Sequence, residues 1–445
     1  MNWDSLISDK RFGLEDFHEA RPGVRSDFQR DFDRLVFSSP FRRLQNKTQV
    51  FPLPGSIFVH NRLTHSMEVA CVGRSLASEV AIRLRPRYAS EEWVDKLGAL
   101  GDITAAACLA HDMGNPPFGH SGEKAISTYF SEGDGRVFRD RLEPEEWADL
   151  TNFEGNANAF RLLTHQFKGR REGGFAMTYS TLASIVKYPY ESRLAGKKGK
   201  FGFFTSEKEG YLRVASALGI KRLGGADGAV RYARHPLVYL VEAADDICYE
   251  IMDIEDAHKL KILSTAEVMP LLLSYFGEER RGSILRMMDR VEDPNEKIGY
   301  LRSCIIGRLV SCCADTFAAH EDEILDGSFE GSLIDHMPER EREAYRACEQ
   351  LSWDKIYCAP DVVELEIAGT RIITFLIHEL VTAVTNPDLN YSRLLLSKVP
   401  EQYQTDSADL YGKLQAVLDH ISGMTDVYAL DLYRRLNGMS LKINN

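Results

Sequence analysis

Apolar side chains recur every three or four residues along most of this chain, which is the period of an amphipathic helix. Between residues 61 and 84, the apolar positions with this spacing are Val69, Val72, Leu76 and Val80. Similar periodicity is found at 284–318, 363–385 and 408–436. The pattern predicts helices in each of these ranges.

Two further segments carry start and stop signals for helices. Residues 100–113 are apolar and rich in alanine, and the sequence Gly114-Asn115-Pro116-Pro117 ends them abruptly. Residues 236–254 open with Pro236, which suits the first position of a helix, and continue without a breaker. Strand-like alternation is scarce, so we predict an all-α fold with at most one small β-hairpin. Its best candidate is 197–213, where glycines bracket three phenylalanines.

Composition narrows the class of protein. Of the 445 residues, 44% are hydrophobic and 27% are charged, as in globular proteins with a sizeable core. The sequence contains no run of about 18 apolar residues and no signal-peptide pattern, so we expect no membrane-spanning helix. None of the eight cysteines belongs to a CxxC pair, which fits free thiols in a reducing cytoplasm.

The formal net charge of −12 argues against a nucleic-acid footprint over the whole surface. A polyanionic substrate would need locally concentrated arginine and lysine instead. Arg42-Arg43 and the segment Lys197-Lys198-Gly199-Lys200 are such places, although each also fits a solvated charged surface.

The adjacent pair His111-Asp112 closes the segment 100–113. Neighbours on a helix point roughly 100° apart, but at the last turn both side chains can lean toward one ion beyond the helix end. An imidazole with a carboxylate suits divalent metals such as Mn, Fe or Zn. A polar helix end is the alternative interpretation. His65 lies on the apolar side of the helix 61–84, so it is either a ligand or a core histidine.

A polar stripe runs along the predicted helix 236–254. Asp245, Tyr249 and Asp253 recur every four residues, on a side separate from the apolar face. Neither aspartate is followed by Lys or Arg four residues on, so the ion-pair pattern of an exposed amphipathic helix is missing. A carboxylate with a phenol one turn away can instead bind a cation and pack against a sugar.

The loop after His111-Asp112 leads to His120 and Glu123, three residues apart where the next helix should begin. A histidine oriented by a nearby carboxylate is a standard arrangement for acid–base chemistry. Alternatively, Ser121 caps the helix and Glu123 favours its dipole. Glu123 can serve both purposes.

Taken in order, His65, His111-Asp112 and Asp245 resemble the H…HD…D signature of HD-domain phosphohydrolases. The surrounding segments are similar to those of the bacterial dGTPase-like triphosphohydrolases. These segments are FRRLQNKTQV at 41–50, NRLTH at 61–65, HDMGNPPFGH at 111–120, NFEGNA at 152–157, residues 179–188 ending in Lys187-Tyr188, and EAADD at 242–246. The likeness is consistent up to about residue 260 and weak beyond it, chiefly at 364–369.

The resemblance implies hydrolysis of a dNTP to deoxynucleoside and triphosphate, by attack at the α-phosphorus with departure of the sugar 5′-oxygen. It implies one divalent metal, Mn²⁺ or Mg²⁺ foremost, with Fe, Co, Ni or Zn as alternatives. The implied ligands are His65, His111, Asp112 and Asp245. We choose Asp245 over Asp246 because only Asp245 shares a helix face with Tyr249 and Asp253.

The same resemblance implies the other roles. His120, supported by Glu123, would transfer a proton to the leaving group or from the water. Arg62 and Lys187 would neutralise phosphate charge. The residues implied to contact the rest of the substrate are Tyr188, Tyr249 against the deoxyribose, and Gln49 and Asp253 at the 3′-hydroxyl.

We therefore expect an HD-type helical core at 1–265, holding the metal ligands and the substrate pocket. A C-terminal helical region at 266–445 would serve oligomerisation and regulation. Family resemblance suggests a homo-oligomer, a hexamer, in the cytoplasm. A dNTP or single-stranded DNA activates some relatives, but no residue of this sequence indicates whether either one activates this protein. The sequence also does not indicate the preferred base or the native metal.

Three other interpretations stay open. Another HD enzyme, such as a 5′-deoxynucleotidase or a phosphodiesterase, would share the four ligands, but we do not expect it to share Gln49, Lys187-Tyr188-Pro189 and Tyr249. A non-catalytic sensor of nucleotide or DNA fits less well because His120 and Glu123 are both present. A purely structural helical protein would require all these coincidences to be accidental.

Overall fold

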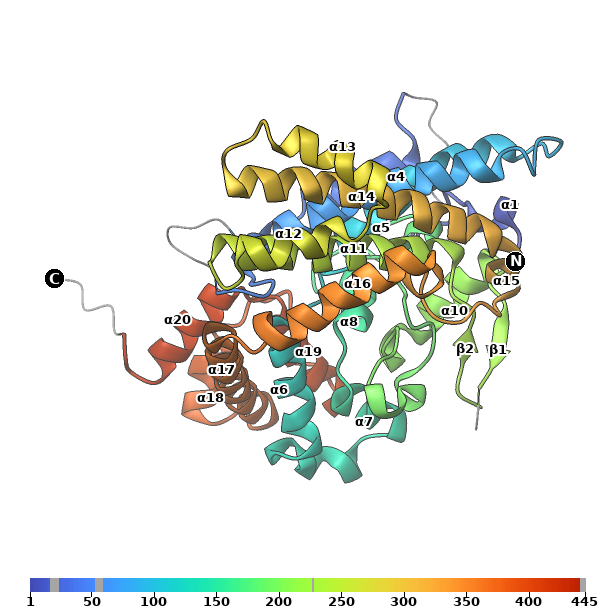
Figure 1. Ribbon diagram of the computed structural model, residues 1–445. Coiled ribbons are helices and arrows are strands. Elements are labelled where there is room, and N and C mark those ends of the chain that lie inside the picture. The colour runs from blue at the N-terminus through green and yellow to red at the C-terminus, as the bar shows by residue number, and fades with distance from the viewer. Residues whose placement is uncertain (17–23, 53–58, 226–227, 441–445) are drawn as a thin grey trace.

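The computed structural model of the protein describes residues 1–16, 24–52, 59–225 and 228–440, and nearly all regular structure in this part is helical (Figure 1). The helices of the first half are α1 Trp3–Leu6, α2 Asp27–Val36, α3 Ser39–Arg43, α4 Arg62–Leu84, α5 Leu100–Ala110, α6 Gly119–Ser131, α7 Pro144–Thr151, α8 Gly155–Thr164, α9 Tyr179–Ser184, α10 Lys208–Ala217 and α11 Pro236–Lys259. Those of the second half are α12 Thr265–Leu273, α13 Glu278–Met288, α14 Pro294–Ala319, α15 Glu321–Asp326, α16 Glu339–Leu351, α17 Pro360–Thr385, α18 Asn390–Leu396, α19 Leu410–Ser422 and α20 Asp426–Leu436. The strands β1 Arg222–Gly224 and β2 Arg231–Tyr232 pair antiparallel.

The two helices expected to carry the site begin where local signals place them. Asn61 caps α4 by accepting a hydrogen bond from the Thr64 amide. Pro236 occupies the first turn of α11, and the His235 ring accepts from the Leu237 amide. The predicted helical ranges 284–318 and 408–436 each contain two helices, because Pro294 begins α14 and Thr425 caps α20.

The β-hairpin lies at 222–232, so its predicted location at 197–213 is wrong. The range 197–213 instead contains short 3₁₀ turns and the first part of α10. Its phenylalanines, Phe201, Phe203 and Phe204, are fully buried. The aromatic run therefore marks a buried loop, since burial of apolar side chains is common to strands and core loops.

Helices α4, α5, α11 and α14 pack together and form the centre of the larger apolar core. Gly73 of α4 faces α5 so closely that a Cβ there would lie 2.5 Å from the Cys108 sulfur. Near the same contact between α4 and α5, the ring centroids of His65 and His111 lie 5.5 Å apart.

Helix α17 packs against α6, α18, α19 and α20 around a second apolar cluster, and Figure 1 shows these helices gathered at one side of the molecule. By length and composition α17 is apolar enough to cross a membrane, but half of that window is buried inside the protein, as in a core helix. The helix itself was predicted at 363–385, but Arg371 and Glu379 interrupt its apolar positions, so it contains no unbroken run of about 18 apolar residues.

Both apolar clusters draw residues from each side of position 265. The larger one extends from Trp3 to Val362, and the smaller one joins 125–204 to 372–432. The division of the chain into two regions at residue 265 stays a prediction, and both apolar clusters contain residues from before and after this position.

Candidate active site

Two histidines and an aspartate from three segments meet in the core. His65 lies in the first turns of α4, His111 follows α5 directly, and Asp245 lies in α11. The Nε2 atoms of His65 and His111 are 3.0 and 3.5 Å from Oδ1 of Asp245, and the three ligand atoms lie within 4.8 Å of one another. The structure thus brings three of the four predicted ligands together, and Asp245 rather than Asp246 joins them.

The fourth predicted ligand, Asp112, lies at the edge of this cluster. Its Oδ1 is 3.7 Å from Nε2 of His111 and accepts a hydrogen bond from the Asn115 side chain at 2.5 Å. Its Oδ2 accepts from the buried Arg62 guanidinium at 2.6 Å. Asp112 is therefore shared between Arg62 and the cluster, and its role as a ligand stays a prediction.

The electrostatics of the cluster favour a cation. His111 donates from Nδ1 to the Cys108 carbonyl at 2.6 Å, which turns Nε2 toward Asp245. Burial lowers the pKa of His111, but the carboxylates of Asp112 and Asp245 raise it to about 9. Burial raises the pKa of Asp245, but the His111 and His65 rings hold it well below its ordinary value. Imidazole and carboxylate donors in this arrangement fit a divalent metal ion such as Mn²⁺.

His120 stands in the same cavity with its side chain 81% exposed. Its Nδ1 lies 2.8 Å from Oε2 of Glu123, and the other oxygen of Glu123 accepts from the Gly155 amide at 2.8 Å. The hydrogen bond and the charge of Glu123 raise the pKa of His120. Helix α6 already begins at Gly119, so Ser121 does not cap it.

The residues predicted to contact the sugar divide into two groups. Gln49 and Tyr249 line the cavity, and Oε1 of Gln49 is buried without a hydrogen-bond partner among the described residues. Asp253 is buried behind the wall and accepts from the Tyr357 hydroxyl at 3.0 Å. Tyr357 itself lines the cavity, with its ring stacked on that of Tyr249. The contact of Asp253 with the sugar stays a prediction, because Tyr357 lies between Asp253 and the cavity.

Two lysines also line the cavity. Lys187, next to Tyr188, lies 3.1 Å from Glu242. Burial lowers the pKa of Lys187, but the charge of Glu242 outweighs this effect and raises it. Lys200 lies 2.6 Å from Glu154 and 3.9 Å from Glu123. Sequence reasoning did not place Lys200 in the site, although the basic segment 197–200 was the signal that contained it.

The cavity has a volume of about 590 Å³, and it is lined by every predicted site residue except Asp253. C-terminal residues between Tyr345 and Glu366 also line it, including Trp353 and Tyr357. The pocket therefore extends beyond the range 1–265 that the sequence analysis assigned to it.

C-terminal residues also contact the two segments that lead to Gln49 and His120. Asp426 accepts from the amide of Phe118 at 2.9 Å and from that of Thr48 at 2.7 Å. Buried Lys47 donates to the carbonyls of Asn115 at 2.5 Å and Ser422 at 2.7 Å. Sequence reasoning missed these contacts, since their partners lie up to 378 positions apart.

The fold and the site together define a helical HD-domain protein. Residues 62–188 match the HD domain family, and residues 336–435 match the phosphohydrolase-associated domain. A deoxyguanosinetriphosphate triphosphohydrolase-like protein of Synechocystis sp. is 39% identical, with 99% of this chain and 100% of that protein covered. A protein of the same name from Pseudomonas aeruginosa is 37% identical, with 99% of each chain covered. The deoxyguanosinetriphosphate triphosphohydrolase of Yersinia enterocolitica is 29% identical, with 96% of each covered.

The chain therefore belongs to the deoxyguanosinetriphosphate triphosphohydrolase-like family of HD-domain hydrolases. This membership confirms the family resemblance, and the helical fold confirms the predicted fold class.

Proposed function

We propose that this protein hydrolyses a deoxynucleoside triphosphate, dGTP foremost, to deoxynucleoside and triphosphate. One observation carries the proposal: a single cavity joins the cluster of His65, His111 and Asp245 to the His120–Glu123 pair. The family names of the relatives support the same substrate class.

We assign one divalent metal, Mn²⁺ or Mg²⁺ foremost, to His65, His111, Asp112 and Asp245. When bound, this ion supplies Lewis acidity toward a phosphate oxygen and the attacking water. Around it, the guanidinium of Arg62 and the ammonium groups of Lys187 and Lys200 offset the negative charge of the triphosphate.

His120 is the group that we assign to proton transfer. Water attacks the α-phosphorus, the bond from phosphorus to the 5′-oxygen breaks, and the leaving oxygen takes a proton. Glu123 holds Nδ1 of His120, which leaves Nε2 to face the substrate. Because Glu123 also favours the protonated ring, His120 is suited to be the general acid for the 5′-oxygen.

The sugar lies against Tyr249 in this proposal. Tyr249 is one helical turn beyond Asp245, and its ring centroid is 6.4 Å from that of His65. A ribonucleotide would have to place its 2′-hydroxyl against this ring. The unpartnered Oε1 of Gln49 is suited to accept a hydrogen bond from the 3′-hydroxyl.

A product assay tests the proposal. The protein is incubated with dGTP, GTP and dGMP in Mn²⁺ and in Mg²⁺, and anion exchange separates triphosphate, pyrophosphate and phosphate. We expect equal amounts of deoxyguanosine and triphosphate from dGTP and little reaction with GTP. Phosphate release from dGMP without triphosphate release from dGTP would indicate a 5′-deoxynucleotidase instead. Equal turnover of dGTP and GTP would contradict the assignment to deoxynucleotides.

From the family resemblance we also propose a cytoplasmic homo-oligomer, a hexamer. Sedimentation equilibrium of the full chain measures its mass against that of the 50.3 kDa protomer. A monomer at micromolar concentration would contradict this part of the proposal.

A further inference from the structure

Each oxygen of the Glu242 carboxylate is paired with a different cation. Oε1 lies 3.1 Å from the Nζ atom of Lys187, and Oε2 accepts a hydrogen bond from the Arg234 guanidinium at 2.9 Å. The Glu242 side chain is only 10% exposed. Lys187 belongs to the described lining of the catalytic cavity and Glu242 does not. Glu242 therefore acts on a bound substrate through Lys187 and through its charge, not by direct contact.

Arg234 fixes the Glu242 carboxylate from the side away from Lys187. It lies between β2 and α11, and its guanidinium packs over the Tyr239 ring, 5.3 Å from the ring centroid. The Tyr239 hydroxyl in turn donates a hydrogen bond to the buried Phe329 carbonyl at 3.1 Å. Lys187 thus meets a carboxylate whose position is set by a second cation, which is itself held in place.

The backbone beside Lys187 is held by its neighbours in space. The Tyr232 amide of β2 donates to the Pro189 carbonyl at 2.9 Å, and the Gly202 amide donates to the Tyr190 carbonyl at 3.1 Å. These bonds fix the main chain, but a lysine ammonium sits at the end of a flexible four-carbon stem. The position of the Lys187 ammonium is therefore set by Glu242.

Glu242 has two opposite effects on a triphosphate at Lys187. It places the ammonium, which favours reaction because catalysis depends on well-positioned charged groups. Its own charge repels the phosphate oxygens, and this repulsion grows as the distance becomes shorter. Free triphosphate carries one more ionisable oxygen than the same group in the ester, so the repulsion is larger for the product than for the substrate.

We propose that Glu242 is a positioning residue that holds the Lys187 ammonium in place for catalysis and limits how tightly the triphosphate product binds. This role rests on the proposed function, because it concerns the product of that reaction. Lys200 also has a carboxylate partner, Glu154 at 2.6 Å, but Glu154 itself lines the cavity. Glu242 is thus the partner that can be changed without removing a group from the cavity wall.

Titration calorimetry with inorganic triphosphate, on the full chain in Mn²⁺, tests this role. In Glu242→Gln we expect the Kd for triphosphate to fall by about three- to tenfold, because a half-screened negative charge is removed. The kcat for dGTP should fall by about tenfold, because the ammonium is no longer fixed. The matched control is Arg234→Gln, which breaks the same contact between Arg234 and Glu242 but keeps the carboxylate beside Lys187. Its Kd should not fall, and its kcat should stay within about twofold of the wild type.

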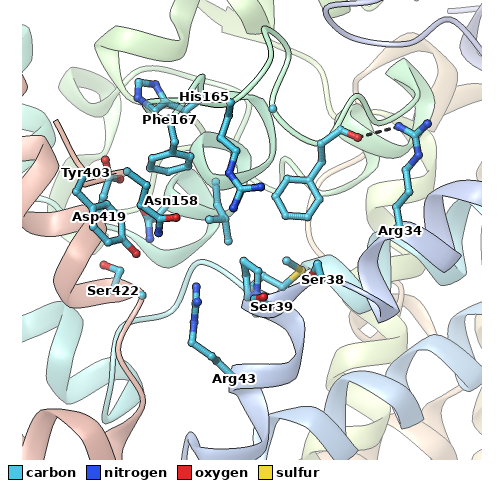
Figure 2. A pocket seen from close by; sticks show the side chains of 18 of the residues that line it. Arg34, Ser38, Ser39, Arg43, Asn158, His165, Phe167, Tyr403, Asp419 and Ser422 are labelled. Atoms are coloured by element: carbon cyan, nitrogen blue, oxygen red, sulfur yellow. Dashed lines mark hydrogen bonds between the residues drawn. The ribbon is translucent and has the colours of Figure 1, made fainter. Parts of the chain in front are cut away.

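A double-mutant cycle separates positioning from a general disturbance of the fold. The loss of kcat from Glu242→Gln should disappear in a Lys187→Gln background, since the two residues act as one unit. A separate cavity of about 840 Å³ also contains cationic side chains, among them Arg34 and Arg43 (Figure 2). Neither Lys187 nor Glu242 belongs to its described lining, so triphosphate bound there contributes equally to every variant.

The variant Glu242→Asp distinguishes charge from position. It keeps the negative charge but withdraws it by one methylene group, so the Kd should stay near the wild-type value while kcat falls. Circular dichroism melting checks that each variant is folded.

Four outcomes overturn the role of Glu242. They are an unchanged or higher Kd in Glu242→Gln, an equal fall of Kd in Arg234→Gln, a wild-type kcat in Glu242→Asp, and a kcat loss of the same size in the Lys187→Gln background. The titration requires no turnover, so it is independent of the product assay. A wild-type protein that releases no triphosphate from dGTP would contradict the proposed function instead.

Discussion

Oδ1 of Asp426 accepts a hydrogen bond from the backbone amide of Phe118 at 2.9 Å, although 308 positions separate the two residues. Phe118 has a left-handed backbone with φ 62°, which is uncommon for a residue other than glycine. The other oxygen of Asp426 accepts from the amide of Thr48. One C-terminal carboxylate thus holds both the turn that leads into His120 and the strand-like segment that carries Gln49.

Asp426 is therefore a positioning residue. In Asp426→Asn, one of the two side-chain oxygens is replaced by an NH₂ group, which would face a backbone N–H donor instead of accepting from it. A buried donor without a partner lowers the free energy of unfolding by about 1–3 kcal/mol. We expect a lower melting temperature and a kcat for dGTP about tenfold below that of the wild type. The control is Asp431→Asn, since Asp431 lies on the same helix and pairs with exposed Arg435. Equal kcat values for the two variants would show that the contact is only structural.

Removal of a ligand from the central cluster is expected to abolish turnover. An ion that binds only the folded protein raises its melting temperature by mass action. His111→Ala and Asp112→Ala should each lose activity and most of the Mn²⁺-dependent rise in melting temperature. His378→Ala, a change at an exposed histidine beside Asp134, should keep both. Wild-type activity and an unchanged melting shift in either ligand variant would show the metal assignment to be wrong.

The His120–Glu123 pair predicts a pH dependence. The hydrogen bond and charge of Glu123 raise the pKa of His120, so the protonated acid persists to higher pH than in a free histidine. In Glu123→Gln the alkaline limb of the kcat/KM profile should therefore move to lower pH. His120→Ala should reduce the rate by about 10²–10⁴-fold, while metal and substrate still bind. An inactive His120→Ala protein that has also lost its metal would make His120 a ligand instead.

Tyr249 is expected to set the preference for deoxynucleotides. Removing its ring relieves the clash with a 2′-hydroxyl, so the ratio of dGTP to GTP turnover should fall by roughly tenfold in Tyr249→Ala, the equivalent of about 1.4 kcal/mol. Absolute activity should fall too, because the ring also packs on the sugar. The control is Tyr391→Ala, at an exposed tyrosine of α18. A ratio that does not change would remove Tyr249 from this role.

His60 makes the stability of the fold depend on pH. Burial lowers its pKa, but the hydrogen bonds to Asp256 and Glu68 raise it to about 10, above the ordinary value of 6.5. The folded state thus holds this proton more tightly than the unfolded state. The resulting contribution to the free energy of unfolding is complete below pH 6.5 and is lost as the pH rises toward 10.

Urea unfolding at pH 6 and pH 9.5 measures this contribution. Wild type should lose more stability between the two pH values than His60→Gln, whose side chain does not titrate. Parallel losses in the two proteins would contradict the assignment of this pH dependence to His60.

The sequence by itself determined the elements whose signals are local. Asn61 and Pro236 mark the starts of α4 and α11 because capping and proline geometry act within one helical turn. The choice of Asp245 over Asp246 likewise followed from the helical period. The H…HD…D signature identified His65 and His111 in the sequence. The packing of α4 against α5 and α11 brings their side chains together.

Only the tertiary structure decided how distant segments complete the site. Lys200 and Tyr357 line the cavity, although no spacing in the sequence distinguishes these two positions. The four-residue spacing placed Asp253 on the face of Asp245 and Tyr249, but only the structure shows that Tyr357 stands between Asp253 and the cavity. Asp426 and Lys47 reach the catalytic loops from elements that are far away in the chain. The physical reason is that periodicity reports which face of a helix is buried, whereas the partner of that face depends on the packing of the whole chain.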